Sequence, residues 1–350
     1  MHTCLLSTAE DLAVYDRFVR HHPQGNLWQS LEWQKYQETL GRETRIYALM
    51  EGTHILASAL VVIDRTALGF STWDIPRGPI WDLGLRTEDL GHFMETISSD
   101  AKMGRCLSLY FSPLHLFPSP KSPVLSPSPR HEQPSATRII DLTRPEADIL
   151  KQMKPKGRYN ITVADKHGVH VEQSEDISAF MGLLKKTGQR DNFTIHSARH
   201  YVTFLKELPG SFLFLAWASQ TPTPVPSPNG GGGSRRGGVG DEIPIAGLLG
   251  VIWGSKAFYY YGASSYEHRA LMAPYALQWA AMRHTKAAGC TTYDLLGIAP
   301  PDAPSNHPWQ GVSAFKEKFG GTVAPYPPEQ EIVLRPMASR LLQLKRKLFG

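Results

Sequence analysis

The sequence predicts a mixed α/β protein, and three observations carry that prediction. Short apolar runs typical of strands alternate with amphipathic stretches of helical length along most of the 350 residues. Hydrophobic residues make up 41% of the chain, which is enough for one large domain or two ordinary ones. Two stretches rich in proline, serine and glycine, 112–136 and 220–242, interrupt the alternation.

The N-terminal third has clear signals for a capped helix and a hairpin. Ser30 stands where an N-cap should be, before LEWQKYQETL, and Gly41 follows as a stop. The strand-like runs RIYALM and ILASALVVI are joined by EGTH, which predicts a β-hairpin. The other elements expected here are a helix over 12–20, a strand over 69–75, a helix over 87–102 and a strand over 106–111.

The stretch 112–136 is expected to be an exposed connector without regular structure. Beyond it, Thr143 and Glu146 have the spacing of a capping box, with Pro145 near the first helical position. The elements expected from there on are strands over 137–142, 169–173, 211–218, 243–253, 256–262 and 291–296 and helices over 146–153, 158–167, 177–187, 197–208, 271–288 and 312–319.

The Pro/Gly-rich stretch 220–242 lies between two expected strands. Its composition cannot bury a core, so we interpret it as an enlarged hairpin loop and not as a domain boundary. We expect the fold to survive its removal.

Charge and cysteine usage narrow the function classes. The net charge of +5 and the pI of about 9.0 fit an anionic partner such as tRNA, a nucleotide-linked substrate or an anionic membrane surface, although mildly basic cytoplasmic proteins are common. Cys4, Cys106 and Cys290 form no CxxC pair, so we expect neither a disulfide framework nor a zinc site. No apolar run approaches the ~20 residues that span a bilayer, and the N-terminus is unlike a signal peptide. We therefore expect a cytoplasmic protein.

Several blocks, taken together and in order, resemble the FemABX family of aminoacyltransferases. They are QSLEWQKYQETLG, IPRGPIWD, ATRIIDL, LKQMKPKGRYNITVADKHGVHVE, FYYYGASS, YDLLGI and FKEKFGG. The resemblance implies two tandem GNAT-like subdomains, the first over 1–136 with 323–350 packing back onto it, and the second over 137–322. It also implies that 112–136 and 220–242 are insertions. No long heptad run is present, so we expect no coiled-coil arm.

The resemblance also implies an activity. Family members take an amino acid from aminoacyl-tRNA and attach it to the stem peptide of a peptidoglycan precursor, which is nucleotide-linked or lipid-linked. We accordingly expect no cofactor and no metal, and a monomer. The basic amphipathic tail from Arg335 to Phe349 either docks on the inner membrane face or packs on its own domain.

Transfer from an ester to an amine needs positioning and stabilisation of an oxyanion more than a nucleophilic side chain. The resemblance places the pair Phe315–Lys316 by the reacting centre, where Lys316 would stabilise the oxyanion or the leaving tRNA end and Phe315 would stack on the terminal adenine. Asp294 would orient the amine or a nearby lysine. The alternatives are a core Phe315, a solvated Lys316 and an Asp294 that only caps a strand.

Basic and aromatic residues supply the expected binding sites. Lys154, Lys156 and Arg158 surround a helix start and would contact tRNA or precursor phosphates, unless they are simply solvated. On the acceptor side, Arg77 would face the groove or close a turn. The remaining candidates for substrate binding are Lys35, Arg199, Tyr201, Tyr259 and Tyr261. Strand alternation predicts that Tyr260 faces away from Tyr259 and Tyr261.

Two other functions remain open. One is a GNAT-like N-acyltransferase that uses acyl-CoA, although GASSYEHRAL after Tyr261 lacks the Q/RxxGxG/A loop that would cradle its phosphates. The other is a tRNA- or precursor-binding protein with a degenerate centre, whose binding would depend on salt.

Overall fold

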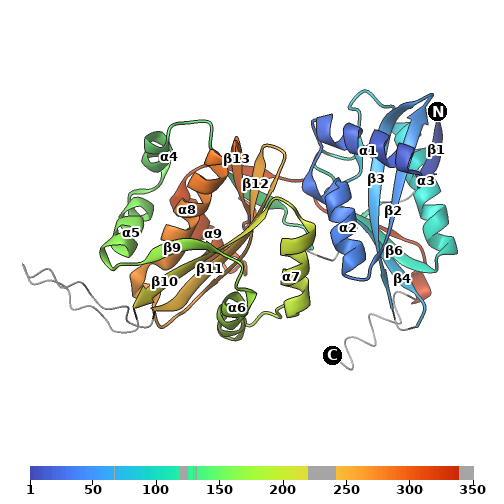
Figure 1. The fold of residues 1–350 in the computed structure, drawn as a ribbon. Helices are drawn as coiled ribbons and strands as arrows, with labels where there is room; N and C mark the ends of the chain where they lie inside the picture. Colours follow the sequence, from blue (N-terminus) through green and yellow to red (C-terminus); the bar gives the residue numbers. More distant parts are fainter. Residues whose placement is uncertain (67, 119–124, 129, 131, 220–241, 339–350) are drawn as a thin grey trace, which may run out of the picture. The chain divides into compact units, whose positions relative to one another are not determined.

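The computed structural model describes residues 1–66, 68–118, 125–128, 130, 132–219 and 242–338. The chain divides into two compact units (Figure 1). Unit 1 contains Met1–Ala136, Pro300–Asp302 and the chain from Pro325 onward, and unit 2 contains Thr137–Ala299 and Ala303–Ala324.

Unit 1 is built on an eight-stranded sheet with the order β1-β2-β3-β4-β6-β15-β7, and β5 pairs with β3. Its strands are antiparallel except that β4 and β6 are parallel. Its elements are β1 (His2–Leu6), α1 (Ala9–His21), α2 (Leu31–Thr39), β2 (Glu43–Glu51), β3 (His54–Arg65), β4 (Ser71–Ile75), β5 (Ile80–Trp81), α3 (Thr87–Met103), β6 (Cys106–Phe111), β7 (Ser126–Pro127) and β15 (Gln330–Val333).

Local sequence signals explain the start of unit 1. The Ser30 hydroxyl accepts a hydrogen bond from the Trp33 amide at 3.1 Å, so Ser30 caps α2 as predicted. Glu51 pairs with His54 across a tight turn, which confirms the hairpin of β2 and β3. Apolar residues of α3, among them Phe93 and Ile97, are fully buried against one face of the sheet.

The expectation that 112–136 has no regular structure is wrong for its described part. Ser126 and Pro127 form β7, which pairs with β15. The Arg130 guanidinium lies 3.0 Å from an Asp74 carboxylate oxygen and 3.2 Å from a Glu329 carboxylate oxygen. A composition count misses this attachment because it depends on carboxylates far away in the sequence.

Replacing Arg130 by Met is expected to destabilise the protein by about 2 kcal/mol at pH 7.5, and by less at pH 5. Burial raises the pKa of Asp74 to about 6, although Arg130 opposes that rise. The folded state therefore binds a proton that the unfolded state has lost, and stability falls as the pH rises from about 4 through 6. Without Arg130 the ionised Asp74 loses its compensating charge. Urea unfolding of both proteins at the two pH values measures the difference.

The matched control is Arg144→Met. Arg144 pairs with Asp141 at 3.0 Å, but the two side chains are 59% and 44% exposed. An exposed pair contributes less than about 1 kcal/mol, so this change should matter little at either pH. Equal losses for the two variants would contradict the role given to Arg130.

Unit 2 is built on a seven-stranded sheet with the order β14-β8-β13-β12-β11-β10-β9. Within it, β12 and β13 are parallel, whereas β9 to β12 pair antiparallel in that order and β13 is antiparallel to β8. Its elements are β8 (Ala136–Asp141), α4 (Glu146–Gln152), α5 (Pro155–Lys166), β9 (His170–Ser174), α6 (Ile177–Asp191), α7 (Ala198–Glu207), β10 (Ser211–Ser219), β11 (Glu242–Trp253), β12 (Lys256–Ser264), α8 (Ala273–Ala287), β13 (Thr292–Gly297), α9 (Gln310–Lys316) and β14 (Thr322–Pro325).

The order of elements in unit 1 recurs in unit 2. The series β1, α1, α2, β2, β3, β4, α3, β6 corresponds to β9, α6, α7, β10, β11, β12, α8, β13. Each series ends in a strand, a crossover helix and a parallel strand, and each lies in the same order across its sheet. The chain therefore contains two copies of one architecture.

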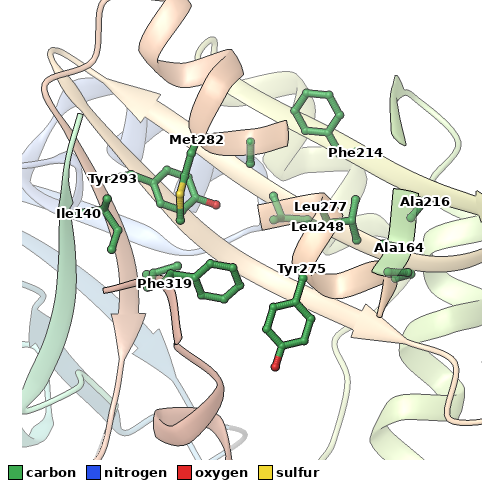
Figure 2. Packing of buried hydrophobic residues seen from close by; sticks show 14 of the residues in the cluster. Ile140, Ala164, Phe214, Ala216, Leu248, Tyr275, Leu277, Met282, Tyr293 and Phe319 are labelled. Carbon is green, nitrogen blue, oxygen red and sulfur yellow. The ribbon is translucent and has the colours of Figure 1, made fainter. Parts of the chain in front are cut away.

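The core of unit 2 lies between the sheet and the helices α4, α5 and α8 (Figures 1 and 2). Figure 2 shows Tyr293 of β13 and Phe319 in this core with Tyr275 and Leu277 of α8. Tyr293 and Phe319 are fully buried, so each contributes roughly 2–3 kcal/mol of apolar burial. The opposite face of the sheet is covered by α6 and α7.

Two expectations about helix starts need correction. Pro145, and not Thr143, occupies the N-cap position of α4, and the Thr143 hydroxyl bonds Asp141 at 2.6 Å. Leu271 belongs to a short 3-10 turn, and α8 begins after Met272, whose φ of 55° breaks the helical pattern. The sequence pattern alone predicts neither of these helix starts, because a capping hydrogen bond and a positive φ depend on the conformation of the neighbouring backbone.

The strands on both sides of the Pro/Gly-rich stretch, β10 and β11, are antiparallel neighbours, as the enlarged-hairpin interpretation requires. The stretch itself, over 220–241, lies outside the described residues, as does most of the tail from Arg335 to Phe349. In the described part of the chain, every helix is too short or too polar to cross a bilayer.

Candidate functional site

The parallel pairing of β12 and β13 ends early. Their last paired residues are Phe258 and Asp294, and beyond these the two strands separate. Leu296 has a φ of 55°, which turns β13 away, and the register between β13 and β8 shifts over the same residues. The carbonyl groups of Leu296 and Gly297 are thereby left without β12 as a partner.

Lys316, the last residue of α9, supplies that partner. Its Nζ donates hydrogen bonds to the carbonyl oxygens of Gly297 at 2.7 Å and Leu296 at 3.2 Å. The residue is only 6% exposed, and burial lowers the pKa of its ammonium to about 8. The interpretation of Lys316 as a solvated surface lysine is therefore wrong.

Asp294 holds the turn that presents these carbonyl groups. Its Oδ1 accepts hydrogen bonds from the Leu296 amide at 2.7 Å and from the Thr137 hydroxyl. Its charge also raises the pKa of Lys316, in opposition to the larger effect of burial. Asp294 thus acts on Lys316 through the backbone and through its field.

The segment that carries Lys316 is fixed by α5. The Lys318 carbonyl accepts a hydrogen bond from the Lys154 amide at 3.1 Å. The Lys154 ammonium lies 2.6 Å from a Glu317 carboxylate oxygen. An ideal Cβ on Gly157 would overlap the Lys318 carbonyl oxygen, so only glycine fits there. The blocks KPKGRYN and FKEKFGG, far apart in the sequence, therefore pack directly on one another.

The two glycines after Phe319 complete this attachment. Gly320 and Gly321 have φ values of 78° and 73°, which glycine adopts without strain. The Arg138 Nη1 donates to their carbonyl oxygens at 2.9 and 3.2 Å. The direction of the chain beyond Lys316 is thus set by β8.

A cavity of about 870 Å³ lies beside this centre, within unit 2. Four aromatic side chains line it together with the C-terminal end of α6, the N-terminal end of α8 and the strands β11 and β12. These aromatic residues are Phe193, Tyr259, Trp309 and Phe315. The Lys316 Nζ lies 5.7 Å from the centre of the Tyr259 ring, which lines the cavity.

A β-bulge corrects the expected arrangement of the three consecutive tyrosines. Leu249 pairs with Tyr261 and Gly250 pairs with Tyr259, so Tyr260 is an extra residue. Tyr260 and Tyr261 both pack on Phe204 of α7, with ring centroids 5.0 and 5.8 Å away. Tyr259 alone packs on the α8 side, against the core of unit 2. The prediction that Tyr259 and Tyr261 share a face is wrong, because alternation breaks at a bulge.

The three residues proposed for phosphate contact differ in their exposure and in their partners. Lys156 is exposed at the start of α5, and Lys154 pairs with Glu317 as described. The Arg158 guanidinium donates to the carbonyl oxygens of Lys151, at 3.2 Å, and Met153. It therefore caps the C-terminal end of α4.

The acceptor-side candidates lie in both units. In unit 1, Lys35 is exposed on α2, whereas Arg77 is 3% exposed. The Arg77 guanidinium donates to the Pro134 carbonyl at 2.8 Å and lies 4.1 Å above the Tyr326 ring, which favours the turn-closing alternative.

In unit 2, the remaining acceptor-side candidates occupy one end of α7 and its neighbour β12. Arg199 is exposed and Tyr201 is 2% exposed. The Tyr201 ring packs on Tyr261, whose hydroxyl lies 2.8 Å from the His200 Nε2.

Several residues of this site were not found from sequence. Gln278 lines the cavity at 2% exposure, and the Tyr293 hydroxyl donates to its Oε1 at 2.9 Å. The sequence did contain one signal for Gln278, since it lies beside the apolar face of α8 and a buried amide there must have hydrogen-bond partners. Trp309 and Arg138 gave no such signal. The described residues contain no group of three or more metal-ligating side chains.

The chain matches a known protein family along most of its length. Residues 11–120, 128–219 and 237–347 match the model of the FemAB family. A lipid II:glycine glycyltransferase of Staphylococcus saprophyticus is 23% identical over 396 residues, which cover 96% of this chain and 95% of that protein. The protein of that name from Staphylococcus aureus is 23% identical over 400 residues, which cover 95% and 94%.

Solved structures show the same fold. The crystal structure of FemX aligns with a TM-score of 0.77 at 20% identity, covering 98% of this chain and 100% of that one. A tandem GNAT protein from the clavulanic acid biosynthesis pathway aligns with a TM-score of 0.55 at 12% identity, covering 95% and 98%. The predicted tandem GNAT-like α/β fold is confirmed, and no coiled-coil arm appears among the described residues. With its family model matched over nearly the whole length, the chain belongs to the FemAB family.

Proposed function

We propose that this protein is an aminoacyltransferase that moves an amino acid from aminoacyl-tRNA to the stem peptide of a peptidoglycan precursor. The observation that carries the proposal is the buried Lys316 ammonium, held by two carbonyl groups beside an aromatic cavity. The staphylococcal relatives, which align over nearly their whole length, are named for glycine transfer to lipid II. Their names support an acceptor of the peptidoglycan-bridge class.

The chemistry requires few protein groups. The acceptor amine nitrogen attacks the ester carbonyl carbon, an N–C bond forms, and the ester C–O bond breaks. The proton that the nitrogen loses passes to the leaving oxygen, which departs as the tRNA hydroxyl. A fixed cation stabilises the oxyanion of the tetrahedral intermediate without reorganising in the transition state. Lys316 would supply that cation, Asp294 would position it, and Phe315 would stack on the terminal adenine.

The other contacts follow from charge and position. Lys154 and Lys156 would meet tRNA phosphates, whereas Arg158 would act by holding α4. Candidates for the precursor are Lys35, Arg199, Tyr201 and Tyr261, whereas Tyr259 would face the donor and Arg77 would act by closing a turn. We also propose that the protein is a monomer. Because a lipid-linked acceptor lies at a membrane surface, the protein would contact the inner membrane face peripherally.

The N-terminal end of α8 argues against acyl-CoA as the donor. A phosphate needs free backbone N–H groups at a helix start. In the first turn of α8, Pro274 has no N–H, and the Tyr275 amide donates to the Met272 carbonyl at 2.9 Å. These losses support an ester donor over a pyrophosphate-bearing one.

The test combines the purified protein with tRNA charged with radiolabelled glycine, alanine or serine and with lipid II or its nucleotide-linked precursor. We expect label in the stem peptide with at least one donor and one acceptor. The two acceptors compared at equal concentration identify the preferred form. Absence of transfer from every charged tRNA, with acyl transfer from acyl-CoA instead, would contradict the proposal.

A further inference from the structure

Tyr259 of β12 is one of the residues that line the cavity. Gly262, three residues further along β12, also lines the cavity. An ideal Cβ on Gly262 would overlap the Tyr259 hydroxyl oxygen. The tyrosine side chain therefore runs along the strand and over the glycine, and this position is available only while residue 262 has no side chain.

A chain of two buried side chains sets the hydrogen-bond direction at this hydroxyl. The Tyr293 hydroxyl contacts Gln278 Oε1 at 2.9 Å, and an amide oxygen can only accept, so Tyr293 is the donor. With its Oε1 engaged by Tyr293, Gln278 has its amide nitrogen available to donate to Tyr259. A hydrogen bond with Gln278 lowers the pKa of Tyr259, as a bond donated to the phenolic oxygen does, so that oxygen is the acceptor.

This direction leaves the hydroxyl hydrogen of Tyr259 for another acceptor. Burial raises the pKa of Tyr259 to about 12, against a smaller lowering by Gln278, so the hydroxyl keeps its proton at physiological pH. A phenolic oxygen that accepts one hydrogen bond can still donate its own hydrogen to a second group. For Tyr259, the space available to such a group is the cavity, because its hydroxyl lies beside Gly262 in the lining.

The charges around the cavity limit the ligand. Its charged lining residues are Arg190 and Asp191, and these pair with each other through two contacts at 2.7 and 2.6 Å. The pair is neutral as a whole, and the Arg190 Nη1 also donates to the Ser264 carbonyl at 3.2 Å. An uncharged ring with a hydrogen-bond acceptor fits such a lining better than a phosphate does.

We propose that the Tyr259 hydroxyl donates a hydrogen bond to an acceptor atom of a nucleoside in this cavity, and that Gln278 and Tyr293 are positioning residues that fix the direction of that bond. The inference rests on the proposed function, which supplies the terminal adenosine of aminoacyl-tRNA as the nucleoside. Phe193, Trp309 and Phe315 provide flat apolar surfaces for its base.

The experiment measures binding without turnover. The probe is adenosine with glycine joined to its 3′ position through an amide, a stable analogue of a glycylated tRNA end. Calorimetry with the full chain should show that Tyr259→Phe weakens binding by about 3- to 10-fold, the size expected for one hydrogen bond. Gln278→Glu replaces the amide donor by an acceptor and should cause a similar loss.

A double-substitution cycle separates positioning from general damage. Tyr293→Phe should weaken binding about as much as Tyr259→Phe, because the freed Gln278 amide can rotate and accept from Tyr259. In the Tyr259→Phe background the same change should have no further effect. Tyr15→Phe, which removes a buried hydroxyl bonded to Gln29 in unit 1, is the control and should leave affinity unchanged.

Each other outcome overturns the inference in a distinct way. Unchanged binding in Tyr259→Phe, or independent losses in the cycle, would refute the direction of the bond while the proposed function stands. Transfer from charged tRNA without binding of the probe would place the nucleoside elsewhere. The absence of both transfer and binding would refute the proposed function, and the inference with it. Thermal unfolding of every variant shows that each is folded at the temperature of measurement.

Discussion

Replacing Lys316 by Ala is expected to lower the rate of aminoacyl transfer on the order of 10²-fold, the size measured for single oxyanion-stabilising donors in other enzymes. The effect should be large because the ammonium is 6% exposed and already held by two carbonyl groups. A cation fixed before the reaction needs no reorganisation as negative charge develops. Single-turnover measurement with charged tRNA and a saturating acceptor isolates the chemical step.

The dependence of this rate on pH tests the protonation state. Since burial lowers the pKa of Lys316 to about 8, the ammonium is lost as the pH rises through 8. If the cation is the active form, the rate should fall above pH 8 in the wild-type protein. Lys316→Arg keeps its charge at these pH values, so any activity that it retains should not show this fall. A rate that instead rises through pH 8 and then levels would show that neutral Lys316 acts as a base.

The control for charge is Lys318→Ala in the same segment. Its Cβ and its backbone carbonyl make the contacts with α5, and alanine retains both. This variant should transfer at close to the wild-type rate. A loss as large as that of Lys316→Ala would mean that the segment needs its total charge and not an ammonium at one place. Rates are corrected for spontaneous ester hydrolysis at each pH.

The features that sequence predicted are those fixed by neighbouring residues. Ser30 caps α2 because its hydroxyl needs only the amide three residues later, and the hairpin of β2 and β3 needs only a short turn. Helical spacing likewise predicted that Tyr275 and Met282 lie on the buried face of α8. The family blocks added Phe315 and Lys316, which spacing alone could not have distinguished from core and surface residues.

The features that sequence missed depend on contacts between distant segments. The bulge at Tyr260 follows from the register against β11, and no local signal marks it. The basic residue Arg158 is turned inward by carbonyl groups at the end of α4. The return of β15 to the sheet of unit 1 depends on pairing with β6 more than 200 residues earlier, as the pair Ile332 and Leu109 shows. Such contacts follow from the fold and not from residue type.

Gly157→Ala is expected to lower the free energy of unfolding by about 1–3 kcal/mol, the cost of forcing extra volume into a packed contact. The new methyl group would overlap the Lys318 carbonyl oxygen, a backbone atom that cannot move without shifting the segment. Gly182→Ala is the matched control, since Gly182 lies in α6 with open space at its Cβ position. That change should raise stability by up to about 1 kcal/mol, because alanine favours the helix.

The activity of Gly157→Ala then shows whether α5 positions Lys316. Lys316 lies two residues before Lys318, so a shifted segment would move its Nζ away from the carbonyl groups of Leu296 and Gly297. Water that enters the gap would raise the pKa of Lys316 from about 8 toward its ordinary value of 10.5. When the rate is measured well below the unfolding temperature of this variant, the pH above which transfer slows should therefore be higher than in the wild-type protein. Loss of folded protein alone would lower the rate equally at every pH and leave that point at 8, which would refute a positioning role for Gly157.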